Sequence, residues 1–157
     1  MALHLTSQAF EPDQPIPETY SQDGANQSPP LSWQGAPEPT AEFALVVDDP
    51  DAPTAEPFVH WLLYKIPAGT DHIQAGVPQS PEPPSPTGAR QGVNSADDTG
   101  YDGPAPPKGY GTHHYHFKLY ALDAELDLSS RVGKQDLLAA MEGHVLEQAE
   151  LIGTYQR

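Results

Sequence analysis

The distribution of proline along the chain limits its fold more than any other feature of the sequence. All 19 prolines fall between Pro12 and Pro107, and none lies in the last 50 residues. Because proline removes a backbone donor and clashes inside a helix, no long helix is expected before Lys108. The first two-thirds of the chain should form strands and ordered loops, with a long Pro/Gly-rich loop over residues 74–108.

Three segments carry the alternation that is typical of strands. Residues 42–48 (EFALVVD) are apolar on both faces, which predicts a central strand covered on both sides. Residues 58–66 (FVHWLLYKI) also have two largely apolar faces. In residues 113–122 (HHYHFKLYAL), the face of His113 and Tyr115 should be buried and the opposite face partly exposed. We therefore expect a mainly β fold.

A helical pattern comes only after these strands. Between Lys134 and Ile152, apolar residues recur at helical spacing, and the acidic residues lie mostly off that stripe. Gly153 follows, where a C-cap glycine would help to end the helix. The sequence thus predicts one C-terminal helix over residues 134–152.

Size and charge argue against several classes of function. A chain of 157 residues suits one domain, and we expect residues 1–157 to form it. No apolar run reaches the roughly 20 residues of a membrane span, which argues against an integral membrane protein. A net charge of -15 repels nucleic acids, and the absence of cysteine excludes thiol nucleophiles and disulfides. The first ten residues lack the features of a secretory signal, so we expect a cytoplasmic protein.

Three carboxylates follow the first predicted strand. In the DDPDAP sequence at 48–53, they could ligate a hard cation, orient a histidine or simply end the strand. His60 lies inside an apolar strand, where a histidine must be hydrogen-bonded or face a cavity. Within one sheet, His60, His113 and the end of the 48–51 turn could converge on one cavity. Carboxylates near the imidazoles would favour their charged form and create a pH-sensitive anion pocket.

The segment 103–111 (GPAPPKGYG) is a stiff loop that leads into the strand with His113. Its amides from Lys108 onward could donate to an anion, although a proline-rich crossover without a ligand is equally consistent. The HHYH sequence at 113–116 invites a metal, but only His114 and His116 share a face and a third ligand is missing. We therefore expect no metal and no cofactor. No serine lies in a G-x-S-x-G elbow, so a catalytic triad is not indicated.

Several short motifs occur in a recognisable order along nearly the whole chain. They are DGANQSPPLSW at 23–33, DDPDAP at 48–53, VHW at 59–61, GYDGPAPP at 100–107, HHY at 113–115, EGH at 142–144 and GTY at 153–155. Together they resemble the phosphatidylethanolamine-binding protein (PEBP) family, also called Raf kinase inhibitor-like proteins. The likeness is greatest to its short bacterial and archaeal branch.

The resemblance implies a large antiparallel sheet packed on a smaller sheet, with a C-terminal α-helix alongside. It also implies a small surface cavity that binds phosphate-like anions or phospholipid headgroups in a protein that is not an enzyme. Carried over position by position, the cavity residues are Asp49, His60 and His113 as lining, Asp51 and Pro53 in the turn beneath, and Gly103, Pro107 and Tyr115 as further pocket positions.

Two departures limit what the resemblance implies. Ala105 stands where many bacterial relatives have cysteine, and Ser21-Gln22 stands where they have Thr-Cys, so no thiol-dependent role is expected. The aromatic lid at the C-terminus of the eukaryotic proteins has no counterpart in the sequence. We therefore do not carry kinase inhibition over from those proteins.

Three functional hypotheses remain open at this point. The first is a non-catalytic protein that binds an anionic group. The second is a hydrolase or lyase that uses an Asp49–histidine pair for general acid–base catalysis. The third is a module that docks on a protein partner, such as a kinase or a protease. The bacterial relatives also suggest a homodimer.

Overall fold

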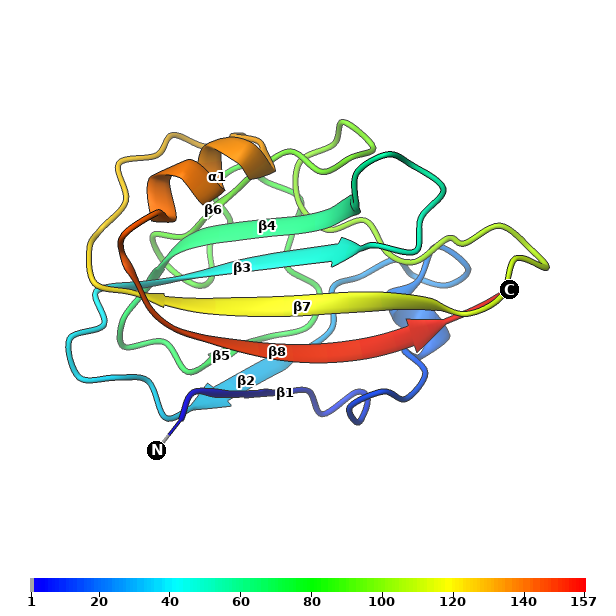
Figure 1. The fold of residues 1–157 in the computed structure, drawn as a ribbon, viewed down its shortest axis with the longest axis horizontal. Coiled ribbons are helices and arrows are strands. Elements are labelled where there is room, and N and C mark those ends of the chain that lie inside the picture. The colour runs from blue at the N-terminus through cyan, green and yellow to red at the C-terminus, as the bar shows by residue number, and fades with distance from the viewer. Residues whose placement is uncertain (1) are drawn as a thin grey trace.

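Two antiparallel sheets form the framework of the structure, a computed structural model that describes residues 2–157 (Figure 1). The large sheet has the strand order β6–β4–β3–β7–β8. Its strands, in that order, are Arg90–Gln91, Phe58–Pro67, Glu42–Asp49, His113–Leu122 and Val145–Tyr155. The small sheet has the order β1–β2–β5. Its strands are His4–Thr6, Leu31–Gln34 and His72–Ile73.

The centre of the large sheet is β3, which pairs with β4 on one side and with β7 on the other. All eight of its residues are buried, as expected for a strand with two apolar faces. In β7, alternate residues from His113 onward are buried. The three predicted strands and the mainly β fold are therefore confirmed.

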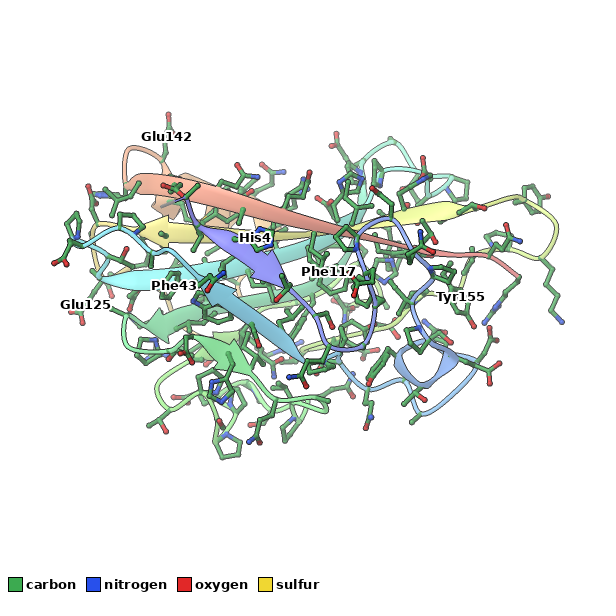
Figure 2. The ribbon with its side chains drawn as sticks, turned by 90° about the horizontal axis from the view of Figure 1, so that it is seen from below. His4, Phe43, Phe117, Glu125, Glu142 and Tyr155 are labelled. Carbon is green, nitrogen blue, oxygen red and sulfur yellow. The ribbon has the colours of Figure 1, made fainter. Side chains whose placement is uncertain are left out.

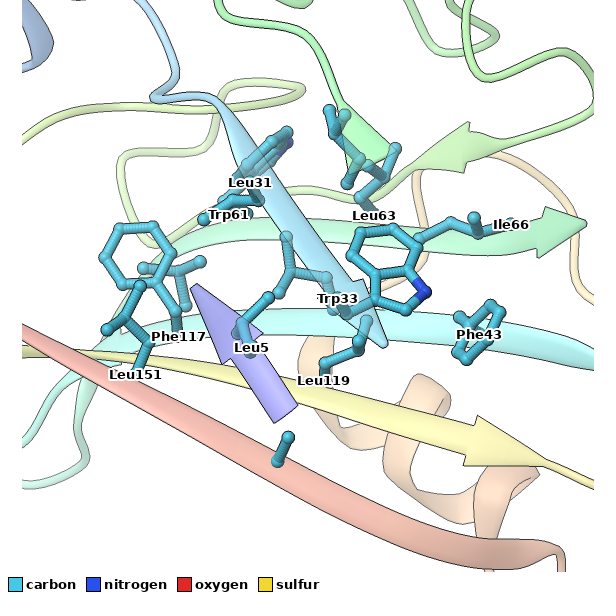
Figure 3. Packing of buried hydrophobic residues seen from close by; sticks show 14 of the residues in the cluster. Leu5, Leu31, Trp33, Phe43, Trp61, Leu63, Ile66, Phe117, Leu119 and Leu151 are labelled. Carbon is cyan, nitrogen blue, oxygen red and sulfur yellow. The ribbon is translucent and has the colours of Figure 1, made fainter. Parts of the chain in front are cut away.

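The main core fills the space between the two sheets (Figures 2 and 3). Figure 2 shows β1 and β2 lying across the strands of the large sheet. The small sheet contributes Leu5, Leu31 and Trp33, and these side chains face residues of the large sheet such as Phe43, Trp61, Phe117 and Leu119. Burial of such large apolar side chains stabilises a protein by roughly 1.5–3 kcal/mol each, so this layer holds the two sheets together.

The one α-helix found in residues 2–157 covers the other face of the large sheet. Helix α1 (Lys134–Met141) packs Leu137 and Met141 against β3 and β4 residues such as Val46 and Tyr64. An ion pair fixes its first turn, because Lys134 Nζ lies 2.8 Å from the buried Asp48 carboxylate at the end of β3. The helix is therefore joined to the same strand that leads into the 48–51 turn.

The predicted helix over residues 134–152 is wrong beyond Met141. The chain turns at Gly143, whose φ is +83°, and then forms the edge strand β8 along the whole length of β7. Ala149, Leu151 and Gly153 are buried in alternation, which is the period of a strand. The helical spacing of Val145, Ala149 and Ile152 was a coincidence of a short segment. Pairing with β7 decides the conformation, because ten pairs of residues face each other along the two strands.

Gly153 is likewise not a helix cap. It lies inside β8, where an added Cβ would stand 2.6 Å from Ile16 Cγ1 and 2.7 Å from Phe10 Cε2. Before Lys108, the only helical element in residues 2–107 is the short 3₁₀ turn Glu18–Tyr20, which agrees with the proline distribution. No helix within residues 2–157 is long and apolar enough to cross a membrane.

Candidate functional site

The three carboxylates of the 48–51 turn point to three different environments. Asp48 is buried on the helix side, where it pairs with Lys118 and Lys134. Asp49 faces the opposite side of the sheet and pairs with His113. Asp51 is half-exposed and pairs with the ring and the backbone amide of His114. The turn therefore does not gather its carboxylates around a cation, and Asp49 alone belongs to the site.

Asp49 and His113 form a buried pair at the end of the large sheet. Asp49 Oδ2 lies 2.6 Å from His113 Nδ1, and the two side chains are only 3% and 6% exposed. The other oxygen of Asp49 accepts a hydrogen bond of 2.8 Å from the Asp51 amide. Because an ionised carboxylate can only accept, Nδ1 of His113 carries the hydrogen. Its Nε2 is then the nitrogen left for a ligand.

His60 is oriented in the same way by a different acceptor. Its Nδ1 lies 2.6 Å from the carbonyl oxygen of Asp102, so Nδ1 donates there as well. The ring packs against Phe58 and against Tyr115, with centroid distances of 4.8 and 5.1 Å. Burial lowers the pKa of His60, and this outweighs the opposing effect of the Asp102 carbonyl. Neutral His60 thus presents a lone pair on Nε2.

A cavity of about 260 Å³ joins these groups. Its walls include Asp49, Pro53, His60, Pro107, His113 and Tyr115. Within residues 2–157, the only fully enclosed side-chain nitrogen or oxygen without a partner is Trp33 Nε1. Among residues 2–157, neither Nε2 atom nor the Tyr115 hydroxyl has a hydrogen-bond partner, and all three residues line the cavity, which leaves these groups for a ligand. Burial raises the pKa of Tyr115, which keeps this hydroxyl protonated as a donor.

Two of the eight predicted site residues lie behind the cavity instead of lining it. Gly103 donates its amide to Asn26 Oδ1 at 2.7 Å, and an added Cβ would stand 2.4 Å from the carbonyl oxygen of Tyr20. Its function is therefore to let the loop that carries Pro107 pack against the N-terminal segment. Asp51 fixes the turn through His114, outside the cavity.

The chain is similar to known proteins along almost its full length. The family model described as phosphatidylethanolamine-binding protein matches residues 6–156. The chain belongs to the PEBP family. A UPF0098 protein of Methanothermobacter thermautotrophicus is 45% identical over 155 residues, with 99% of each chain covered.

Two crystal structures of PEBP homologues share this fold. One is a PEBP homologue from Chlamydia trachomatis, with a TM-score of 0.88 and 38% identity, covering 99% of this chain and 98% of that one. The other is an Escherichia coli member of the mammalian PEBP family, with a TM-score of 0.93 and 31% identity, covering 100% and 99%. The fold that the motifs implied is therefore confirmed.

The rim of this PEBP cavity differs from the predicted anion-binding loop in one respect. The Gly109 amide donates to the Arg157 carbonyl at 3.2 Å, and the Tyr110 amide donates to the Pro107 carbonyl at 3.3 Å. These two amides already have acceptors in the protein and are not free for an anion. The loop instead places Lys108 near the end of the chain, where Lys108 helps to hold the pKa of Asp23 below its usual value, after the larger effects of Tyr155 and Arg157.

Sequence reasoning missed Gln22, Phe58 and Arg157 as neighbours of the site. Gln22 and Phe58 line the cavity. Arg157 pairs with Asp23 at 3.0 Å beside the rim. The only signal for Gln22 was its place in Ser21-Gln22, where the sequence departs from the pattern expected for the bacterial branch. Arg157 gave no signal, because its position depends on the pairing of β8 that the helical pattern concealed.

The HHYH sequence places its outward histidines beside separate carboxylates. His114 pairs with Asp51 and His116 pairs with Glu150. Among residues 2–157, no three histidine, aspartate or glutamate side chains gather closely enough to hold a metal ion. Both contacts lie at the surface, where such a pair contributes little energy and is an ion pair only when the histidine is protonated.

Proposed function

We propose that this PEBP-family chain is a non-catalytic binding protein whose cavity accepts a phosphate-like anionic group. The observation that carries the proposal is the convergence of three polar groups on one small cavity: Nε2 of His60, Nε2 of His113 and the Tyr115 hydroxyl. All three are held by the fold before a ligand arrives. A phosphoryl group offers several oxygens that such convergent groups can bind.

The hydrogen-bond donors and acceptors of the two histidine rings determine the protonation state of the complex. With both Nδ1 atoms donating to protein oxygens, each neutral ring offers only an acceptor to the ligand. An oxyanion therefore binds when it brings a P–OH hydrogen to Nε2, or when an imidazole takes up a proton and becomes a donor. Both routes leave the complex with a proton that the separated partners lack at high pH.

The size and charge of the cavity define the ligand further. A volume of about 260 Å³ lies below the roughly 300–1,000 Å³ of pockets for drug-sized ligands, so a small group fits. Ala52, Pro53, Phe58 and Pro106 give it largely apolar walls, which suit the short carbon chain of a headgroup. The net charge of -15 opposes the approach of an anion, so we expect modest affinity that improves with screening salt.

Phosphate binding should weaken as the pH rises from 6 to 8. The complex holds an extra proton, so the affinity should fall by up to about tenfold per pH unit in this range. His60 predicts the same direction of the pH dependence. Burial lowers the pKa of His60 in the free protein, and a bound anion raises that pKa again, so binding takes up a proton. NMR titration of the imidazole signals with inorganic phosphate at several pH values measures both effects.

Three probes distinguish the two sources of the anionic group. Inorganic phosphate and phosphoethanolamine test the free anion, and vesicles that contain phosphatidylethanolamine test a lipid headgroup. We expect the signals of His60 and His113 to shift, with those of the exposed His114 as the internal control. If His60 and His113 remain unshifted at millimolar ligand while other signals move, the proposed site is wrong.

The Asp49–His113 pair also gives a specific reason to test a second function. A carboxylate on Nδ1 and a free Nε2 is the arrangement of a general base. The one aliphatic hydroxyl that lines the cavity belongs to Thr54, and it donates to the Glu56 carbonyl instead of to a histidine. A hydrolase would release product from phosphoester or ester substrates faster than its His113→Ala variant. Equal background rates would leave binding as the function.

A further inference from the structure

The tip of the loop beside the cavity, residues 108–111, has the properties of a movable cover. We call it the strap. It directly follows Ala105, Pro106 and Pro107, which form one wall of the cavity. Tyr110 lies at its centre and is 78% exposed, more than any other large hydrophobic residue within residues 2–157. An exposed aromatic ring next to a partly apolar cavity has area to bury if the strap closes.

The strap can move without disturbing the rest of the fold. Gly109 and Gly111 flank Tyr110 with φ values of +80° and +87°, and an added Cβ at either glycine would meet nothing within 4 Å. Both glycines therefore lie in open space and have wide conformational freedom. The two backbone hydrogen bonds of the strap measure 3.2 and 3.3 Å, at or beyond the long end of the usual range. Pro107 before it and the buried His113 after it are fixed points.

The cavity lacks a cation that the strap can supply. Its walls contain the Asp49 carboxylate and neither lysine nor arginine. Six of the seven basic side chains are already bound within residues 2–157: Lys65 to Glu42, Lys118 and Lys134 to Asp48, Arg157 to Asp23, Arg90 to the Leu128 carbonyl and Arg131 to Thr99. Lys108, on the strap, has neither an ion pair nor a hydrogen bond with the described residues. Its ammonium can therefore pair with a ligand without first breaking a side-chain hydrogen bond or a close ion pair.

We infer that the strap closes over an anion in the cavity, so that Lys108 pairs with the anion and Tyr110 covers the mouth. Closure supplies the charge that the cavity walls lack and removes an exposed ring from water. Closure breaks the two long backbone hydrogen bonds of the strap, and the pairing of Lys108 with the anion offsets their loss. The inference rests on the proposed anion binding, and it adds Lys108 and Tyr110 to the binding residues.

Limited proteolysis of the full chain tests the closure directly. Trypsin cuts after Lys108, inside the strap, and also after Arg131, which is exposed and lies outside the cavity. Saturating inorganic phosphate should slow cleavage of the Lys108–Gly109 bond by about fivefold or more, because a closed strap cannot enter the protease. Cleavage at Arg131–Val132 should stay unchanged. Equal slowing at both bonds would indicate a general effect and would overturn the inference.

Substitutions measure the contribution of Lys108 to affinity. Lys108→Gln should weaken phosphate binding by about fivefold, the scale of one partly exposed ion pair, and Lys108→Arg should largely keep it. Arg131→Gln removes the same charge elsewhere and is the matched control, so it should leave the affinity near that of the wild type. If Lys108→Gln and Arg131→Gln lose phosphate affinity equally, the net charge alone explains the effect and closure of the strap is contradicted.

The two proposals fail in different ways. If phosphate does not move the His60 and His113 signals, anion binding itself is wrong. If it moves them while strap cleavage is unchanged and Lys108→Gln binds like the wild type, only the strap is wrong. The amide signals of Gly109 and Gly111 give an independent readout, since they should shift on binding even if trypsin cuts the free strap slowly.

Discussion

The His113→Ala substitution should destabilise the protein by about 3 kcal/mol and abolish phosphate binding. The substitution leaves the Asp49 carboxylate, whose side chain is 3% exposed, without its partner. Leaving a buried polar group without its hydrogen-bond partner typically costs about 1–3 kcal/mol, and more for a charged group, and the open cavity next to Asp49 lets water recover a part of that. The ring stacked on Tyr115 is lost as well. Urea unfolding and phosphate titration measure the two effects.

His114→Ala is the matched control for this prediction. His114 is the next residue of β7, but it points outward and pairs with Asp51, and both side chains are more than 40% exposed. Exposed pairs contribute roughly 0–1 kcal/mol, so the free energy of unfolding should change by less than about 1 kcal/mol, and phosphate should still bind. If the two alanine variants lose the same stability, the buried pair is not the element that holds this end of the sheet.

The Gly103→Ala substitution should destabilise the protein about as much as His113→Ala does, although Gly103 does not line the cavity. In Gly103→Ala, the new Cβ would stand 2.4 Å from the Tyr20 carbonyl oxygen and 3.0 Å from Ser21 Cα. Both contacts are with backbone, so the whole loop must shift. Overpacking of this kind costs roughly 1–3 kcal/mol, and the shift would displace Pro107 and the Asp102 carbonyl that orients His60.

Gly69→Ala provides the comparison, because an added Cβ at Gly69 meets nothing within 4 Å. Its free energy of unfolding should change by less than about 0.5 kcal/mol. For Gly103→Ala, the phosphate affinity should fall together with the stability, as chemical denaturation and titration at the same temperature would show. If Gly103→Ala is as stable as Gly69→Ala, the loop can accommodate the added methyl group and the close packing around Gly103 is not a constraint.

Much of the fold was predictable because its central strands carry strong local patterns. β3 and β4 are apolar on both faces, and β7 alternates cleanly from His113. The error at β8 has a physical cause: in a short segment, apolar residues at 145, 149 and 152 match a helix, and the partner that imposes strand geometry lies some 30 residues earlier. Long-range pairing thus overrode a weak local preference.

The residue types of the candidate site could be named from the sequence, but their arrangement around the cavity could not. A histidine inside an apolar strand required a partner, and the structure supplies the Asp102 carbonyl, which no residue pattern specifies. Six of the eight proposed cavity residues line one cavity. Asp51 and Gly103 do not line it, because the order of residues in a motif does not indicate which of their side chains face the cavity. The contact of Arg157 with Asp23 joins segments near the two ends of the chain, so no pattern in the local sequence predicts it.

The divergence of the three turn carboxylates has a consequence for insertions and deletions. Adjacent residues 48 and 49 serve opposite faces of one sheet, and the third carboxylate binds the outside of β7. A shift of the strand by one residue would turn the Asp48 carboxylate, which pairs with Lys134, toward His113. The same shift would move Asp49 to the helix side of the sheet, away from His113. The spacing of these residues, as much as their identity, therefore builds the candidate site, and we expect changes of loop length to be tolerated elsewhere before they are tolerated at this point.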